Sequence, residues 1–228
     1  MECPLRFFTV WLFSMLAYAL HGQVNGGDNV FELLNLSNSP RVTALGGHLI
    51  TVFDDDVNLA YGNPALLNPA MHQQIAFNHN FHLNSVSNGY AAYGHHVSAL
   101  ATTFHAGFQY VGYGEMTQTD ELGQVLGTFK ANDYAVTFGA GRQVDERLYL
   151  GANLRLLTSQ LESYSSFGIS GDLAAAYRDT SGLFLATLVF RNIGTQLTTF
   201  SENNREPLPF EIQLGISKRL RYLPFRLS

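Results

Sequence analysis

The chain has 228 residues, enough for one large domain or two small ones, and 46% of them are hydrophobic, which suffices for a sizeable core. Only 14% are charged, a low share for a soluble surface, and the net charge of -5 excludes a generally basic surface, so we expect no nucleic-acid partner. The 17 Phe, 11 Tyr and 21 Gly are typical of a protein with rings at bilayer interfaces and glycines facing a crowded lumen.

The N-terminus is typical of a cleaved signal peptide. Arg6 precedes an apolar run over residues 7–20, which is too short to cross a bilayer core of about 30 Å as a helix but suits a signal-peptide apolar region. We expect residues 1–22 to be removed, with cleavage after Ala19 or after Gly22. Cys3 is lost with them, so the mature chain is predicted to have neither disulfides nor thiol chemistry. No later stretch offers about 18 uninterrupted apolar residues, which leaves a periplasmic, secreted or outer-membrane barrel protein.

Residues 23–74 show little alternation and are interpreted as a periplasmic plug, or hatch, ahead of the strands. They contain three prolines and an acidic run at 54–56. The stretch 41–47 predicts a short helix or turn, and 49–53 an extended piece. The sequence from Asn63 to Leu67 predicts a helical turn that begins with Pro64.

From residue 75 onward, alternating segments follow one another. They predict nine strands, at about 75–83, 89–97, 99–111, 133–143, 148–159, 166–177, 183–192, 209–218 and 224–228.

The clearest pair is the hairpin from Asp133 to Gln160. Its apolar positions are Tyr134, Val136, Phe138 and Ala140 in the first arm and Leu148, Leu150, Ala152, Leu154 and Leu156 in the second. Because successive strand side chains point to opposite faces, one face is apolar and the other carries Asn153, Arg155 and glycines. The alternation recurs at 99–111 and 209–218. Arg155 and Glu211 both fall on inward-facing positions, where a strand in a membrane tolerates charge.

The connections between the predicted strands alternate between short and long. Short ones lie near 97–98, 144–147, 178–182 and 219–223, and longer ones near 84–88, 112–132, 160–165 and 193–208. Outer-membrane barrels have short periplasmic turns and long external loops, so the first strand is expected to begin in the periplasm. Closed bacterial barrels normally have an even number of strands. The count of nine predicts that the chain is a fragment of a longer barrel.

The predicted fold is therefore all-β, an antiparallel transmembrane β-barrel of the FadL-like class that is incomplete in this chain. Its predicted parts are the signal peptide at 1–22, the plug or hatch at 23–74 and the barrel strands at 75–228, with the C-terminal strands missing.

Several segments resemble the PorQ proteins of the type IX secretion system, in the PorV/PorQ group of FadL-like outer-membrane barrels. The run from Gly26 and the stretch Phe190-Arg191-Asn192-Ile193-Gly194 point to this group, whereas related NPA segments occur throughout the FadL-like barrels. Together the similar segments cover almost all of the mature chain: GGDNVFELLNL (26–36), SPRVTALGGHLITVFDDDVNLAYGNPALLNP (39–69), GYAAYGHH (89–96), FQYVGYGEMTQTDELGQVLGTF (108–129), QLESYSSFGISGDLAAAY (160–177), LVFRNIGTQ (188–196) and EPLPFEIQLGISKRL (206–220).

This resemblance implies a non-catalytic member of the cell-surface attachment complex in the outer membrane. The implied partners are the PorU sortase, PorV and a large PorZ-like surface subunit, together with outer-membrane lipid. Such a complex removes the C-terminal signal of exported cargo proteins and attaches them to surface lipopolysaccharide. The implied role of this chain is to anchor the surface subunit. The family is longer than this chain, with about 14 strands expected for the FadL-like class.

No catalytic, cofactor-binding or metal-binding residues are predicted, and no cofactor. Five histidines, at positions 79, 82, 95, 96 and 105, come close together in sequence. However, both His79 with His82 and His95 with His96 split across the two sheet faces, whereas a metal needs convergent ligands. Interfacial or lumen-facing histidines are the favoured interpretation.

Two acidic groups have alternative interpretations. The run Asp54-Asp55-Asp56 lacks the spacing of a Ca²⁺ loop, and a turn or helix start is favoured. The stretch with Glu115, Asp120 and Glu121 is interpreted as a solvated external loop tip or as a docking patch.

The sequence contains the three residue types of a Ser-His-Asp enzyme, but two common enzyme motifs are not found. No G-x-S-x-G elbow is present, and the Gly-x-Gly pairs at 112–114 and 139–141 lack the strand-to-helix setting of a nucleotide loop.

Three functions remain open at this stage. The first is a structural, partner-binding barrel of the attachment complex. The second is a FadL-type channel for hydrophobic solutes with residues 23–74 as its hatch, although the inward-facing positions are polar for such a path. The third is a soluble periplasmic β-domain.

Overall fold

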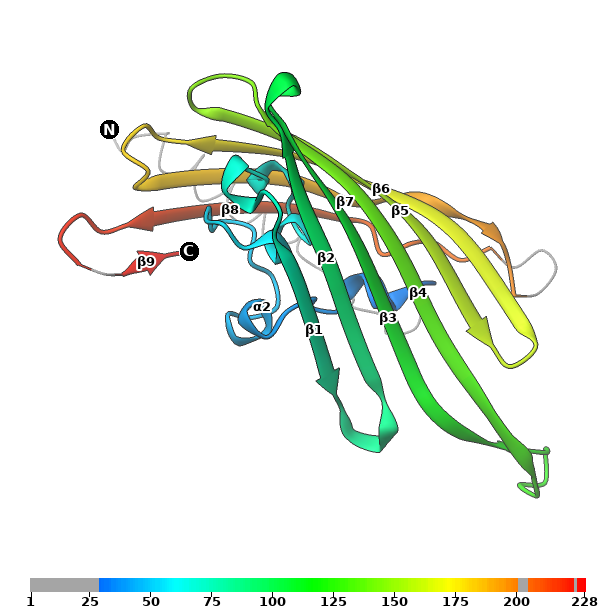
Figure 1. Cartoon of the computed structure of the whole chain (residues 1–228). Helices are drawn as coiled ribbons and strands as arrows, with labels where there is room; N and C mark the ends of the chain where they lie inside the picture. Colours follow the sequence, from blue (N-terminus) through cyan, green and yellow to red (C-terminus); the bar gives the residue numbers. More distant parts are fainter. Residues whose placement is uncertain (1–28, 201–204, 224) are drawn as a thin grey trace, which may run out of the picture.

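The computed structural model describes residues 29–200, 205–223 and 225–228. The predicted signal peptide and residues 23–28 lie outside this part of the chain. The fold is all-β, with nine antiparallel strands in one sheet and each strand paired to the next along the sequence. The sheet is open, because no pairing joins β1 to β9 within the described residues (Figure 1).

All nine predicted strands are present. Their bounds are β1 (Ile75–Phe81), β2 (Ser87–Val97), β3 (Thr102–Thr119), β4 (Val125–Gln143), β5 (Leu148–Leu161), β6 (Tyr164–Arg178), β7 (Phe184–Thr198), β8 (Glu211–Arg219) and β9 (Arg226–Leu227). Short 3-10 turns follow two of them, η5 (Leu83–Ser85) after β1 and η6 (Ser98–Leu100) after β2.

The predicted alternation of short and long connections is wrong in two places. Most of the expected loop 112–132 is strand, because β3 and β4 continue to pair with each other as far as Thr119 and Val125. The expected loop 160–165 is a two-residue turn, since β5 ends at Leu161 and β6 begins at Tyr164. In both places polar residues, such as the pair Gln160 and Ser165, occupy strand positions. In these two places, low hydrophobicity therefore indicates the polar ends of strands and not loops.

Residues 29–74, which we call the inner segment, contain short helices joined by irregular backbone. The helices are η1 (Glu32–Asn35), α2 (Pro40–Ala44), η2 (Val57–Tyr61), η3 (Pro64–Leu66) and η4 (Pro69–Met71). The predicted helix near residue 41 and the helical turn begun by Pro64 are confirmed.

A polar cap followed by proline begins three of these helices. Ser39, Asn63 and Asn68 each accept a hydrogen bond from a backbone N–H of the first turn, and the next residue in each case is proline. Proline suits the first helical position because its missing N–H would have no partner there.

The sheet curls around the inner segment (Figure 1). Helices η2 and η4 contact strands in the first third of the sheet, whereas η3 contacts β4, β5 and β6. We call the sheet face toward this segment the inner face and the opposite one the outer face. Three buried apolar clusters join the inner segment to the sheet. They lie around Leu59, Leu66 and Val189, around Leu33, Leu34 and Leu157, and around Val57, Tyr61 and Tyr90.

The predicted assignment of side chains to the two faces is confirmed. In β4 and β5 the apolar positions of the predicted hairpin are exposed or half-exposed on the outer face, whereas Thr137, Asn153 and Arg155 are buried on the inner face. The same holds for β8, where Ile212, Leu214 and Ile216 are exposed. Within the described ranges, no helix is long and apolar enough to cross a membrane.

Candidate functional site

A buried ion pair lies at the centre of the inner face. Arg155 of β5 donates a hydrogen bond from Nη1 to Oδ1 of Asp172 on β6, and its Nη2 atom lies equally close to Oδ2; both N···O distances are 2.6 Å. Neither side chain is exposed. This two-point geometry is the strongest that an Arg and a carboxylate form. It compensates for removing both charges from water, which otherwise costs several kcal/mol for each ion.

Neighbouring amides satisfy the rest of the carboxylate. Asp172 also accepts hydrogen bonds from the Asn153 side chain, at 3.0 Å, and from the backbone N–H of Asn192, at 2.9 Å. Asn153 in turn bonds the Nε2 atom of His105 through its carbonyl oxygen, at 2.9 Å. Four strands, β3, β5, β6 and β7, therefore contribute to one buried polar network.

A β-bulge in β7 brings two polar residues to the inner face together. The register shifts between Gly171 and Leu173, so that Arg191 and Asn192 both lie opposite Asp172. Asn192 has a φ of 57°, a left-handed conformation that Asn tolerates better than most residues. Both side chains are consequently buried, although neighbouring strand residues normally face opposite sides.

The strands supply hydrogen bonds to the carbonyl groups of the inner segment. Arg155 donates to the Tyr61 carbonyl at 2.6 Å, and Asn153 donates to that of Ala60 at 3.1 Å. Further donations of the same kind come from Gln109 to Leu33, Arg191 to Leu34, Thr187 to Ile50 and Ser217 to Thr51. Buried backbone carbonyls must be paired, and a segment with only short helices pairs some of its own but not all. The polar side chains of the inner face therefore hold the inner segment in place.

Two glycines allow the inner segment to approach the sheet. Gly141 and Gly151 are directly paired across β4 and β5. A Cβ atom on either glycine would collide with the carbonyl group of Pro64. Glycine is required where one backbone approaches another this closely.

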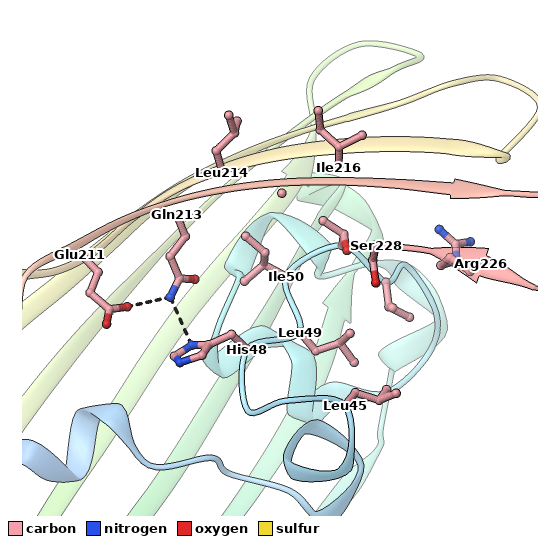
Figure 2. A pocket seen from close by; sticks show the side chains of 13 residues that line it. Leu45, His48, Leu49, Ile50, Glu211, Gln213, Leu214, Ile216, Arg226 and Ser228 are labelled. Atoms are coloured by element: carbon pink, nitrogen blue, oxygen red, sulfur yellow. Dashed lines mark hydrogen bonds between the residues drawn. The ribbon is translucent and has the colours of Figure 1, made fainter. Parts of the chain in front are cut away.

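A hollow of about 700 Å³ lies between the inner segment and β8 (Figure 2). On one wall, the Gln213 side-chain amide donates to Glu211 at 2.7 Å and contacts His48 Nδ1 at 3.3 Å. Leu49 and Ile50 line it from the inner segment, whereas Leu214 and Ile216 extend from the opposite side of β8 (Figure 2). The hollow thus combines an aliphatic surface with hydrogen-bonding groups.

The five histidines do not converge. His105 is buried in the central network, and His82 lies in the turn after β1, where it bonds Asn88 at 2.7 Å. His79 bonds the Tyr110 hydroxyl at 2.6 Å, and His96 bonds the Thr103 hydroxyl at 2.9 Å. Among the residues that the structure describes, no three His, Cys, Asp or Glu side chains gather as metal ligands.

The acidic run at 54–56 has a structural role. Asp56 caps η2 by accepting a hydrogen bond from the backbone N–H of Asn58. Asp54 and Asp56 both pair with Arg41, at 2.5 and 3.1 Å. The hydrogen bond from Arg41 to Asp54 is the main reason that the pKa of this guanidinium is raised. The favoured interpretation of this run as a helix start is confirmed at Asp56.

Sequence reasoning missed three members of the central network: Asp172, Arg191 and Tyr61. A signal was present for Asp172, because alternation places it on the strand face opposite to Ile169 and Leu173, where an acidic residue would need a cation as partner. Alternation from Leu185 and Val189 also places Arg191 inward, whereas Asn192 reaches the same face only through the bulge, which alternation cannot predict.

Comparison with known proteins adds no family to these observations. No protein-family model matches the chain, and no curated protein matches it significantly.

Proposed function

We propose that the chain is an outer-membrane β-barrel protein and a non-catalytic component of a type IX secretion attachment complex. In this role it anchors the surface subunit that helps attach exported cargo proteins to the cell. The resemblance of its sequence segments to the PorQ proteins supports the choice of complex. The two faces of the sheet support the membrane location and the anchoring role.

The outer face supports a position in lipid. All outward-facing residues of β5, β6 and β7 are uncharged, whereas the inner face carries Arg155, Asp172 and Arg191. A soluble sheet has no reason to exclude charge from its exposed side.

The height of the apolar surface also supports a position in the outer membrane. In β5 it runs from Leu148 to Leu156, and eight steps of about 3.3 Å give roughly 26 Å along the strand. A strand tilt of about 40° reduces this to about 20 Å, close to the apolar band of roughly 25 Å in outer-membrane barrels.

The main observation in support of the anchoring role is that the inner segment is hydrogen-bonded to the strands. Its carbonyls accept hydrogen bonds from side chains of β3, β5, β7 and β8. A mobile hatch would have to break these bonds and leave the Arg155–Asp172 pair with unsatisfied donors, at a cost of about 1–3 kcal/mol for each lost partner. A permanently filled interior suits a scaffold better than a conduit.

The test is a mild-detergent pull-down of the full-length tagged protein from isolated outer membranes, with partners identified by mass spectrometry. We expect the sortase and the large surface subunit to be recovered. Recovery of the barrel alone, from membranes that contain both partners, would contradict the proposal.

One observation favours a FadL-type channel for hydrophobic solutes as the second candidate. A mainly apolar pocket of about 530 Å³ lies between η1 and strands β2 and β3, lined in part by Leu36, Val86 and Val111. Uptake of a radiolabelled long-chain fatty acid that depends on this protein would support the channel. Equal uptake with and without the protein would exclude it.

A further inference from the structure

The two longest strands leave the sheet together. The last β3 residue paired to β2 is Gly112, and the first β4 residue paired to β5 is Ala131. Residues 113–130, which we call the ribbon, therefore form strand pairs only with each other, apart from one backbone hydrogen bond from the Glu162 N–H to the Lys130 carbonyl at its base. Figure 1 shows this end of β3 and β4 extending beyond the neighbouring hairpins.

The direction in which the ribbon leaves the sheet is set at its base. The β3–β4 register shifts between Gly112 and Glu115, and Gly114 within this shift has a φ of 76°. A Cβ atom on Gly114 would lie 3.1 Å from the Cβ of Ser85 in the β1–β2 turn. On the other side, Gln118 donates to Glu162 of the β5–β6 turn at 3.3 Å. Both neighbouring turns thus support the ribbon.

The tip of the ribbon has a defined conformation. The Asp120 carboxylate accepts the backbone N–H groups of Leu122 and Gln124, at 3.0 and 2.8 Å. The backbone N–H of Gly123, whose φ is 81°, donates to the Asp120 carbonyl. An Asp that bonds the backbone after it in this way fixes a turn. The tip is therefore organised before any partner binds.

The ribbon exposes apolar side chains at this tip. Leu122 is 84% exposed, Val125 69% and Leu126 65%. An isolated two-stranded ribbon is only marginally stable in water, so exposed aliphatic groups at its end need a reason. Large exposed apolar side chains on an ordered support are typical of the anchor residues of protein interfaces.

The charge of the ribbon indicates which kind of partner can bind to it. It carries Glu115, Asp120 and Glu121 against the single cation Lys130. An acidic surface is repelled by anionic lipid headgroups and by a second copy of itself, whereas it attracts a basic protein surface.

We propose that the ribbon docks a protein partner that presents an apolar pocket bordered by Lys or Arg, with Leu122 as the residue that enters the pocket. Under the proposed function, on which this inference rests, the partner is the surface subunit of the attachment complex. The ribbon places the contact beyond the apolar band, where a subunit outside the bilayer can reach it.

The test repeats the outer-membrane pull-down with two full-length double variants. The ribbon variant combines Leu122→Ser with Glu121→Lys. The control variant makes a comparable pair of changes, Val144→Ser with Glu146→Lys, in the exposed β4–β5 turn at the other end of these strands. Correct folding of each is checked by resistance to denaturation by dodecyl sulfate before heating.

We expect the ribbon variant to recover at least about tenfold less of the surface subunit than the wild type, because central anchors carry most of the binding energy. The control variant should match the wild type. Raising NaCl from about 0.1 to about 1 M should weaken the wild-type contact, since the screening length falls from about 10 to about 3 Å. A photo-crosslinking amino acid at position 122 should attach to a Lys- or Arg-rich peptide of the subunit.

Three results would overturn this inference. Equal recovery by the ribbon variant and the wild type would remove the ribbon from the contact but leave the proposed function standing. Crosslinking of position 122 to lipid or to a second copy of the chain would assign the tip to another occupant. Failure of the wild type to recover any subunit would reject the proposed function and the docking inference together.

Discussion

Arg155 and Asp172 form a two-point ion pair across adjacent strands, with neither side chain exposed to solvent. The same Arg155 donates to the Tyr61 carbonyl of the inner segment and lies over the Tyr61 ring, 4.7 Å from its centroid. One guanidinium therefore connects two strands to the segment that fills the interior. The pair is a structural element whose loss should affect both.

Removal of one partner of this pair should be strongly destabilising. Asp172→Ala leaves the Arg155 charge buried without its counter-ion, and a broken buried pair costs about 3–5 kcal/mol. We expect the free energy of unfolding, measured by urea titration of the protein in lipid vesicles, to fall by that amount. The double variant Arg155→Met with Asp172→Leu should be more stable than Asp172→Ala. A double variant as unstable as Asp172→Ala would contradict the electrostatic explanation.

The approach of the inner segment to the sheet should depend on Gly151. Gly151→Val places a side chain where the Pro64 carbonyl lies, so the inner segment should move away from β4 and β5. Limited proteolysis should then cleave within residues 57–71 at least several-fold faster. Gly127→Val is a matched control, because a Cβ atom at Gly127 has no neighbour within 4 Å. Unchanged cleavage in Gly151→Val would show that this contact does not hold the segment.

Asn63 should contribute more than an ordinary helix cap. Its side chain accepts the N–H of Ala65 at 3.0 Å and donates to the Ile50 carbonyl at 2.9 Å, and the residue is fully buried. Loss of a cap costs about 1 kcal/mol, and an unsatisfied buried carbonyl adds about 1–3 kcal/mol. Asn63→Ala should therefore destabilise by about 2–4 kcal/mol. The exposed Asn35→Ala, in which only a bond to Glu32 is lost, should change stability by less than about 0.5 kcal/mol.

A charged residue on the outer face should lower the stability of the protein if this face lies in lipid. Leu154 is 48% exposed at the centre of the β5 apolar run. Leu154→Arg should lower stability in vesicles by about 2–4 kcal/mol, the cost of a cation near the bilayer midplane. The same change at Leu122, beyond the apolar band, should cost little. Equal and small effects at both positions would show that the outer face is in water, as a soluble periplasmic domain requires.

Much of the sheet follows from the sequence, because a period of two distinguishes the faces of a strand without knowledge of the partners. Leu154 and Ile212 were correctly placed outward, and Arg155 and Glu211 inward, Glu211 on the wall of the hollow beside β8. The ends of β3 and β4 were missed, since their polar residues pair outside the apolar band and carry no hydrophobic alternation. The inward position of Asn192 could not be predicted, because only the bulge brings it to the same face as Arg191. The proposed docking surface lies in the region that the alternation could not describe.

Attachment of cargo to the cell surface tests the central claim most directly. The measurement is the amount of surface-bound cargo on cells that lack this protein, compared with the same cells supplied with the wild-type gene. We predict that cargo is released into the medium without the protein and is bound again when the wild type is restored. Undiminished surface cargo in the deletion strain would contradict the proposed role in attachment.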